Sequence, residues 1–444
     1  MSPTIDPRSP VVIGVGQFLN RDDSVEPDPT ELIAEAARSA ERDTGASGVL
    51  AALDTIGVVP IVSWRYSDPS VILAPLLGAS PAMTMYPAMG GNTPQMLMNR
   101  IGERIVAGTT DLALMCGGEP YRSRMRTRRA GVSPPWVRQD LDAVTPGWTD
   151  GGSFDMAHAA ELAKGILLPT QAYPLFENAL RHVAGRTAAE HTAAVSEMWA
   201  GFSAVAAANP YAWDRAVHTA TEIGEVTAEN RVVGFPYTKR MVSNPDVDMS
   251  SAVIVCSAER AEALGISRDR WVFLHAGADG ADGYLSNRPS FTSSAAIRFA
   301  GRATLELAGR TIDEIAHLDV YSCFPSAVQV ACRELDISLD RQLTVYGGLC
   351  FAGGPWNNPV GHALATMVDV LRNDAGEFGL VTANGGNIQK HSFGVYSTEP
   401  PADGFRTAHP QFAIDTDVGP TVAAEDHVGP VTIETWTVMH ERDG

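Results

Sequence analysis

Two passages of this chain repeat one pattern, and that repeat constrains the fold more than any other feature of the sequence. The first passage runs from Gly90-Gly91-Asn92-Thr93-Pro94 to Cys116-Gly117-Gly118, and the second runs from Gly353-Gly354-Pro355 to Asn384-Gly385-Gly386. In each, a glycine turn precedes an apolar stretch of helical period, and a buried strand leads into a second pair of glycines. We therefore predict two similar halves whose loops meet at a shared site.

Apolar runs and helix-forming stretches alternate along both halves. The runs at 11–16, 111–116 and 252–256 predict buried strands, while 29–42 and the stretch after Thr93 predict helices. Such alternation is typical of an α/β fold with a mainly parallel sheet covered by helices. Because 444 residues are too many for one ordinary core, we expect two or three lobes.

Two regions depart from this alternation. An arginine cluster opens the region from about 120 to 245, and prolines, tryptophans and a long helical stretch at 174–208 follow it. We interpret this region as an insertion over the sheet. After Pro400 the chain is loop-like up to 431–438, where alternation with period two predicts an isolated strand. One strand cannot fold alone, so it must pair with the body of the protein or with a partner.

Composition narrows the classes of function. A formal charge of −19 argues against general nucleic-acid binding. The sequence has neither an apolar run long enough for a membrane span nor the apolar segment of a secretory signal, so we expect a cytoplasmic protein. The five cysteines are scattered through apolar runs, as reduced thiols are, and no CxxC or HExxH spacing predicts a metal site.

In the order and spacing of its segments the chain resembles the thiolase superfamily, most closely the sterol-carrier-type thiolases and the actinobacterial acetyl-CoA acetyltransferase-like proteins. The matching segments are Ile105–Glu119, 243–252, 319–324, 346–348 and 384–396. The resemblance implies a five-layered α/β/α/β/α thiolase fold with two pseudo-symmetric halves. These halves would be 1–120 with part of 246–260, and 260–400, with an inserted loop domain at 121–245 and a C-terminal extension at 401–444.

The resemblance also implies that the catalytic side chains of the family are replaced. The family's acyl-accepting cysteine, at the N-terminus of the first repeat's helix, falls on Gly91. The histidine of its Gly-His-Pro motif falls on Gly354, and its acid/base cysteine falls on Asn384. A helix N-terminus lowers the pKa of such a cysteine, and a glycine has no thiol to activate. We therefore expect an acyl-CoA-binding protein of lipid or sterol metabolism that forms no acyl-cysteine and holds no covalent cofactor.

Groups that can bind a thioester remain at the predicted site. Free N–H groups at a helix N-terminus can face an anion or a carbonyl oxygen. The backbone groups that we expect there belong to Gly91, Asn92, Thr93, Gly354, Gly385 and Gly386. Asn384 and His391 are further candidates, although His391 is equally well explained as a residue that holds its loop.

Two tyrosines extend the range of possible chemistry. Tyr321 and Tyr346 fall where family loops reach the pocket, and thiolase-like aldol lyases cleave β-hydroxyacyl-CoA with tyrosines while working with an OB-fold partner. A tyrosine acts as general acid or base only where its environment tunes its pKa. The alternative is that both tyrosines are packed and hydrogen-bonded in the core. Cys350 is either a displaced nucleophile or, more often for such a residue, a small buried packing residue.

Three functions follow as alternatives: residual transferase activity through Cys350, a β-hydroxyacyl-CoA retro-aldolase, and a non-catalytic acyl-CoA-binding or scaffold protein. Guanidinium groups suit the phosphates of coenzyme A, and the alternative for the arginine cluster is a solvated loop. Its members are Arg122, Arg124, Arg126, Arg128 and Arg129. The resemblance implies a homodimer through the sheet of the first half. We expect residues 405–444 to dock on a separate OB-fold protein, because an unpaired strand edge invites pairing.

Overall fold

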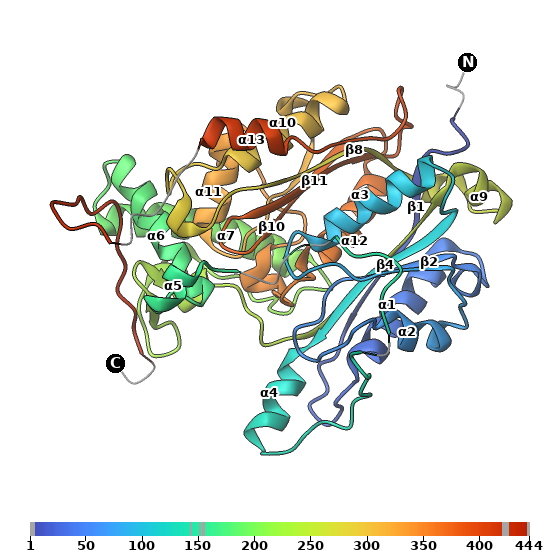
Figure 1. The fold of residues 1–444 in the computed structure, drawn as a ribbon, viewed down its shortest axis with the longest axis horizontal. Helices are drawn as coiled ribbons and strands as arrows, with labels where there is room; N and C mark the ends of the chain where they lie inside the picture. Colours follow the sequence, from blue (N-terminus) through green and yellow to red (C-terminus); the bar gives the residue numbers. More distant parts are fainter. Residues whose placement is uncertain (1–4, 143, 151, 153–155, 420–425, 442–444) are drawn as a thin grey trace.

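The computed structural model describes residues 5–142, 144–150, 152, 156–419 and 426–441 (Figure 1). Its main sheet has ten strands in the order β3-β2-β4-β7-β1-β8-β11-β10-β9, with β12 beside β8. The first five belong to the N-terminal half: β1 (Pro10–Leu19), β2 (Thr55–Val58), β3 (Met83–Met85), β4 (Leu112–Pro120) and β7 (Asp248–Ser257). The next four belong to the C-terminal half: β8 (Val272–Ala281), β9 (His317–Asp319), β10 (Phe378–Gly385) and β11 (Lys390–Ser397).

The two halves have the same strand order. Read from the outside inward, β2-β4-β7-β1 corresponds to β9-β10-β11-β8. The halves join where β1 and β8 pair at Val11–Phe273 and Val12–Val272. The prediction of a mainly parallel sheet is wrong, because the sheet is mixed: β2 is parallel to β3 and β4, but β7 and β11 return antiparallel between their neighbours. A short turn joins β10 to β11, and such turns connect antiparallel strands.

Helices complete the five expected layers. The central layer consists of α3 (Thr93–Val106) and α12 (Pro359–Asn373), each of which contacts strands of both halves. One outer layer holds α1 (Pro29–Thr44) and α2 (Ser70–Leu77) against the first half. The other holds α10 (Ala295–Leu307) against the second half, with α11 (Pro325–Glu334) beside it. The α/β thiolase-type architecture predicted from the sequence is therefore confirmed.

Local chemistry places the ends of these helices. Helix α1 begins at Asp28, whose carboxylate accepts the Thr30 N–H, while the Glu31 side chain reaches back to the Asp28 N–H. Helix α3 lays Leu97, Ile101 and Ile105 into the core at the spacing of one helical face.

The chain between β4 and β7 forms the region over the sheet. It contains α4 (Tyr121–Arg129), α5 (Ala159–Ala163), α6 (Pro169–Val183), α7 (Ala188–Ala208), α8 (Ala220–Gly224), β5 (Val232–Gly234) and β6 (Tyr237–Thr238). The helical stretch predicted at 174–208 is two helices, because Gly185 adopts a left-handed φ of 66° between them. Helix α6 packs against α11, and α7 packs against the turn at 348–352.

Two predictions for the C-terminal region are wrong. The stretch after Pro400 is not all loop, since it contains β12 (Arg406–Ala408) and α13 (Gln411–Val418). The segment 431–438 forms no strand. Its Thr435 and Thr437 hydroxyls bond carbonyl oxygens of the inserted region. Backbone pairing is confined to its end, where the Phe235 N–H donates to the Val438 carbonyl beside the β-bridge Gly234–Met439.

Candidate functional site

A cavity of about 500 Å³ lies where the two halves meet the inserted region. It brings together five residues predicted from the sequence: Gly91, Tyr321, Gly354, Asn384 and Gly386. We call it the central cavity. The turns at 90–91 and 384–386 are in direct contact, since a β-carbon on Gly385 would lie 3.0 Å from the Gly90 Cα atom. The predicted meeting of the two repeats at one site is therefore present in the fold.

The space beside Gly91 is occupied by the hydroxyl of Tyr321. A β-carbon on Gly91 would lie 2.5 Å from the Asn384 carbonyl oxygen and closer still to the Tyr321 hydroxyl. Within the described part of the chain no hydrogen-bond partner is found for that hydroxyl, and Tyr321 lines the cavity. Burial raises the pKa of Tyr321 well above its ordinary value, so the phenol stays neutral and acts as a donor.

A second hydroxyl stands beside Gly354 in the same way. A β-carbon on Gly354 would collide with Ser243 Oγ, whereas the nearest backbone oxygens lie 3.3 and 3.4 Å away. Ser243 also lines the central cavity. The two glycines onto which the resemblance maps a cysteine and a histidine thus each face a hydroxyl supplied by a distant segment.

Asn384 completes the polar end of the cavity. Its Nδ2 donates to the Tyr173 hydroxyl at 3.0 Å, and that hydroxyl donates to the Gly386 carbonyl at 2.9 Å. Tyr173 is held by stacking on Phe324, with ring centroids 4.4 Å apart. Asn384 Oδ1 is buried and finds no partner among the described residues. A buried acceptor without a donor carries a free-energy cost, and the described residues do not offset that cost at this oxygen.

The thiol in this cavity is inert. Cys323 lines it, but burial raises the pKa of its thiol to about 12, so thiolate is scarce at neutral pH. Cys350 lies outside the central cavity, and its Sγ donates to the Arg240 carbonyl at 2.8 Å. Burial raises the pKa of Cys350 as well. Neither cysteine has the low pKa that a nucleophile needs.

Three other predicted residues lie behind the cavity wall. Asn92 turns its side chain toward Gly385, and Thr93 bonds the Ala88 carbonyl. His391 borders a void of about 10 Å³ that Tyr321 and Asn384 also border. Burial lowers the pKa of His391 to about 4, and its Nε2 finds no partner in the described chain. His391 is therefore neutral and adjoins the two cavity residues without reaching the cavity.

Tyr346 lies away from the central cavity. Its hydroxyl donates to the carbonyl oxygens of Ala352 (3.1 Å) and Gly353 (2.9 Å), and its ring stacks on His362. Its contacts fix the backbone just before Gly354. The alternative of a packed, hydrogen-bonded tyrosine describes Tyr346, whereas Tyr321 has a free hydroxyl at the cavity.

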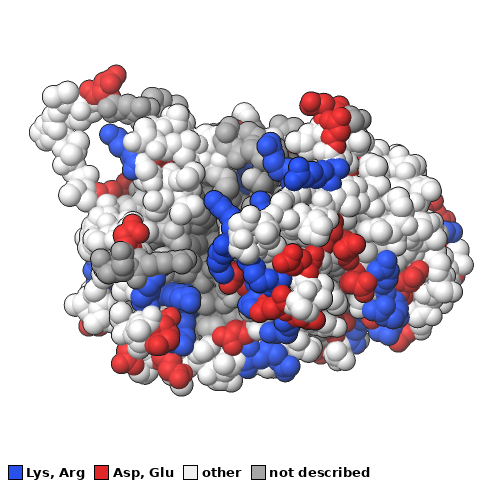
Figure 2. Space-filling view, turned by 90° about the horizontal axis from the view of Figure 1, so that it is seen from below, with Lys and Arg blue, Asp and Glu red and all other residues white. Residues whose placement is uncertain are grey.

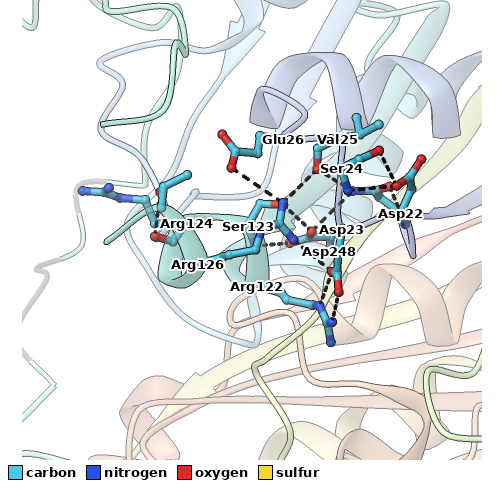
Figure 3. Close-up of polar contacts among 12 residues, drawn as sticks. Asp22, Asp23, Ser24, Val25, Glu26, Arg122, Ser123, Arg124, Arg126 and Asp248 are labelled. Atoms are coloured by element: carbon cyan, nitrogen blue, oxygen red, sulfur yellow. Dashed lines mark hydrogen bonds and ion pairs between the residues drawn. The ribbon is translucent and has the colours of Figure 1, made fainter. Parts of the chain in front are cut away.

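The arginines of α4 divide into two groups. Arg122 and Arg126 bind Asp23 with nitrogen–oxygen distances of 2.8 and 2.9 Å, and Arg126 also bonds the Val25 carbonyl (Figure 3). Arg124 points away from this network (Figure 3). Arg124 and Arg128 line a second cavity beside the central one, while Arg129 is exposed and lines neither.

Sequence reasoning missed several residues of the central cavity. Ser243 is the first residue of the segment 243–252, which resembles the thiolase superfamily. No motif in that segment marks Ser243 as a site residue. Tyr173 comes from the middle of an amphipathic helix, where an aromatic residue indicates core packing. Trp356 and Asn357 belong to the second glycine turn, which the repeat did mark. The repeat was thus the sequence signal that pointed to the central cavity, and it marked only part of the residues that line it.

Within the described ranges, no three His, Cys, Asp or Glu side chains are grouped so that they could hold a metal ion. Among the described helices, none combines the length and apolar character needed to cross a bilayer.

Comparison with known proteins matches the whole fold. A monomeric SCP2-thiolase-like protein type 1 from Mycobacterium smegmatis is 33% identical, with 98% of this chain and 88% of that chain covered and a TM-score of 0.84. An Ltp2–ChsH2(DUF35) aldolase is 18% identical (88% and 98% covered, TM-score 0.67). The dimeric peroxisomal thiolase of Saccharomyces cerevisiae is 13% identical (89% and 98% covered, TM-score 0.63). The last two show the fold alone. No family model and no curated protein sequence matches the chain.

Proposed function

This chain belongs to the SCP2-thiolase-like proteins of the thiolase superfamily, and we propose that it binds an acyl-CoA thioester in the central cavity without transferring the acyl group to a cysteine. The observation that carries this proposal is the Tyr321 hydroxyl beside Gly91. It fills the space that a nucleophilic side chain at position 91 would need. The site therefore offers hydrogen-bond donors where related enzymes offer a thiolate.

The chemistry of the cavity suits a thioester. Met89, Phe324 and Leu349 give it apolar walls for an acyl chain. At its polar end a neutral Tyr321 can donate to the thioester carbonyl oxygen, and helix α3 begins there with no side chain capping its N–H groups. Donors aimed at one carbonyl oxygen polarise it without any covalent step.

Mass spectrometry and calorimetry test the proposal together. After incubation with acetyl-CoA or a medium-chain acyl-CoA, we expect the intact mass of the protein to be unchanged while calorimetry records binding. Tyr321→Phe removes the proposed donor and should weaken acyl-CoA binding about fivefold. Tyr346→Phe, whose hydroxyl points elsewhere, is the matched control. An acyl adduct on any cysteine, or no acyl-CoA binding by the wild type, would refute the proposal.

A retro-aldolase acting on β-hydroxyacyl-CoA is a second candidate, favoured by two hydroxyls, those of Tyr321 and Ser243, beside one cavity. In this reaction the β-hydroxyl loses its proton and becomes a carbonyl, the α–β carbon bond breaks, and the resulting enolate takes up a proton. A neutral Tyr321 would stabilise that enolate oxygen. Tyr321→Phe should then abolish cleavage of a β-hydroxyacyl-CoA, and Tyr346→Phe should not.

A protein partner would bear on this second candidate. The similar Ltp2 aldolase was solved with a DUF35 protein. In this chain Val428, Val431 and Ile433 are between 79% and 96% exposed. We propose that 426–441 is where a separate OB-fold protein packs. Val431→Asp with Ile433→Asp should then prevent assembly with such a protein while leaving acyl-CoA binding unchanged, as calorimetry and sedimentation can show.

A further inference from the structure

A second hollow of about 610 Å³ opens beside the central cavity, and Val62 and Tyr121 border both. Three separate segments supply it with arginines: the loop after β2, helix α4 and the loop at 138–141. We call it the arginine pocket, and its four cations are Arg65, Arg124, Arg128 and Arg138. Its lining contains no carboxylate. Four like charges around one hollow repel each other unless an anion joins them.

Among the described residues these four cations have no acidic partner. In the described part of the chain, none of the four takes part in an ion pair, although the protein carries a formal charge of −19. Two arginines of the same helix show the contrast, because Arg122 and Arg126 are neutralised by Asp23 (Figure 3). The face that carries α4 shows basic side chains in several groups, only some of them beside acidic ones (Figure 2). Carboxylates are thus plentiful, yet none lines this hollow.

The arginine side chains of the pocket contact a tryptophan ring instead of a carboxylate. The guanidinium groups of Arg124 and Arg138 lie 5.4 and 6.0 Å from the centre of the Trp64 ring. Trp64 is itself fixed, since its Nε1 donates to the Val137 carbonyl at 2.8 Å and Trp136 packs edge-on against it. Cation–π contact steadies the two guanidinium groups without neutralising them. Their N–H donors therefore remain available to a ligand.

We propose that the arginine pocket binds a phosphate group of a ligand. Guanidinium groups form forked hydrogen bonds to phosphate oxygens, and several converging on one hollow suit a group with two negative charges. The phosphate has two candidate sources: the nucleotide end of a coenzyme A thioester that reaches into the central cavity, or a separate phosphorylated ligand. The first source rests on the proposed function, because the two hollows adjoin at Val62 and Tyr121; the phosphate site itself does not.

Calorimetry at low salt with three probes separates these sources: coenzyme A, dephospho-coenzyme A and adenosine 3′,5′-bisphosphate. Arg124→Gln and Arg138→Gln should each weaken binding of the bisphosphate about tenfold. Arg129→Gln removes the same charge from the same helix outside the pocket and should change it less than twofold. Thermal melting of each variant confirms that it is folded.

Each outcome is decisive for the pocket. If the two pocket variants also weaken coenzyme A binding and the wild type prefers coenzyme A to dephospho-coenzyme A, the phosphate is that of coenzyme A. If they weaken only the bisphosphate, the pocket serves a separate phosphorylated ligand. If the wild type does not bind the bisphosphate, or if Arg129→Gln matters as much as Arg124→Gln, the proposal is overturned. If the wild type binds acyl-CoA but not the bisphosphate, the proposed function stands and only this inference is removed.

Discussion

The two repeated passages build the same scaffold but present different parts of it to the central cavity. In the first repeat the glycine turn lies at the tip of α3, so Gly91 itself lines the cavity. In the second the turn is longer and reaches across to the first half. There Asn357 bonds the Pro60 carbonyl and Asn358 bonds the Gly117 carbonyl, each at 2.9 Å. The first turn therefore serves the site directly, and the second also fastens the halves together.

The glycine pairs at the strand ends differ in the same sense. A β-carbon on Gly117 would strike the Asn358 side chain, and one on Gly118 would strike Ile33, so this pair permits close packing. In the second repeat Gly386 has a left-handed φ of 66° and borders the cavity. The same glycine pair thus permits close packing in the first half and lines the central cavity in the second. The difference teaches that the repeat specifies backbone shape, and that each half uses this shape differently.

The largest expected effect comes from adding one methyl group to each glycine turn. Gly91→Ala should cost about 3 kcal/mol of the free energy of unfolding, because the obstructing Asn384 oxygen belongs to the backbone and cannot turn away. Gly354→Ala should cost about 1.5 kcal/mol, since its main obstacle is the Ser243 hydroxyl. Urea denaturation measures both.

Double variants sharpen this first prediction. Ser243→Ala should restore most of the stability lost in Gly354→Ala, whereas Tyr321→Phe should restore little of that lost in Gly91→Ala. Equal rescue in the two pairs would show that the turns are equivalent after all.

The next comparison is between two buried carboxyl groups, and it concerns how stability depends on pH. Glu119 lies near the end of β4 and accepts the N–H groups of Val62 and Ser63, and Asp319 ends β9 and accepts those of Val345 and Tyr346. Burial raises the pKa of Glu119 to about 7 and that of Asp319 to about 6. The folded protein therefore holds these protons at a pH where the unfolded chain has released them. The contribution of these two carboxyls to stability should fall as pH rises toward 7, whereas buried neutral histidines such as His391 contribute in the opposite direction.

Glutamine at position 119 tests the size of that effect. Relative to Glu119→Gln, which cannot titrate there, the wild type should lose about 2 kcal/mol of unfolding free energy between pH 5 and pH 8. The corresponding difference from Asp319→Asn should be smaller. Urea denaturation at a series of pH values measures both slopes. A difference in unfolding free energy between the wild type and Glu119→Gln that stays constant over this range would contradict the raised pKa of Glu119.

Much of the fold was predictable because it depends on local pattern. The apolar runs at 11–16 and 111–116 became β1 and β4, and the glycine repeat located both central helices. Strand direction was not predictable, because it depends on which strand returns beside which. The strand expected at 431–438 is absent for a related reason: alternation also occurs in an irregular segment, which here is held by side-chain bonds at Thr435 and Thr437 and by a backbone bond only at Val438.

The sequence predicted the backbone turns that form the site, but not the side chains that lie beside them. The repeat marked Gly91, Gly354 and Asn384, and all three line one cavity. It could not indicate which side chains occupy the adjacent space, because Tyr321 and Ser243 come from segments far away in the sequence. Tyr321 and Tyr346 were indistinguishable as residue types, and only packing separates a free hydroxyl from one bonded to two carbonyls.

The outer edge of the first half offers a smaller test. The strand β3 is covered by the chain's own backbone, since Trp148 donates to the Thr84 carbonyl and accepts from the Tyr86 N–H, at 2.9 and 3.1 Å. An edge already paired cannot pair with a second copy. We therefore expect sedimentation to show a monomer. Trp148→Pro removes the N–H donor, should cost about 1 kcal/mol and should allow self-association at high concentration. A wild-type dimer that Trp148→Pro leaves unchanged would point to an interface elsewhere.

The smallest expected effect separates the two tyrosines by opposite results. Tyr346→Phe removes a hydroxyl that bonds the Ala352 and Gly353 carbonyls, so it should cost about 1 kcal/mol of stability. Tyr321→Phe removes a hydroxyl with no such bonds and should leave stability nearly unchanged. Acyl-CoA binding should show the reverse order, because only the Tyr321 hydroxyl faces the cavity. Paired melting and calorimetry on the two variants decide this. If both lose stability alike and neither loses binding, Tyr321 is a packing residue and the hydroxyl beside Gly91 has no role in binding.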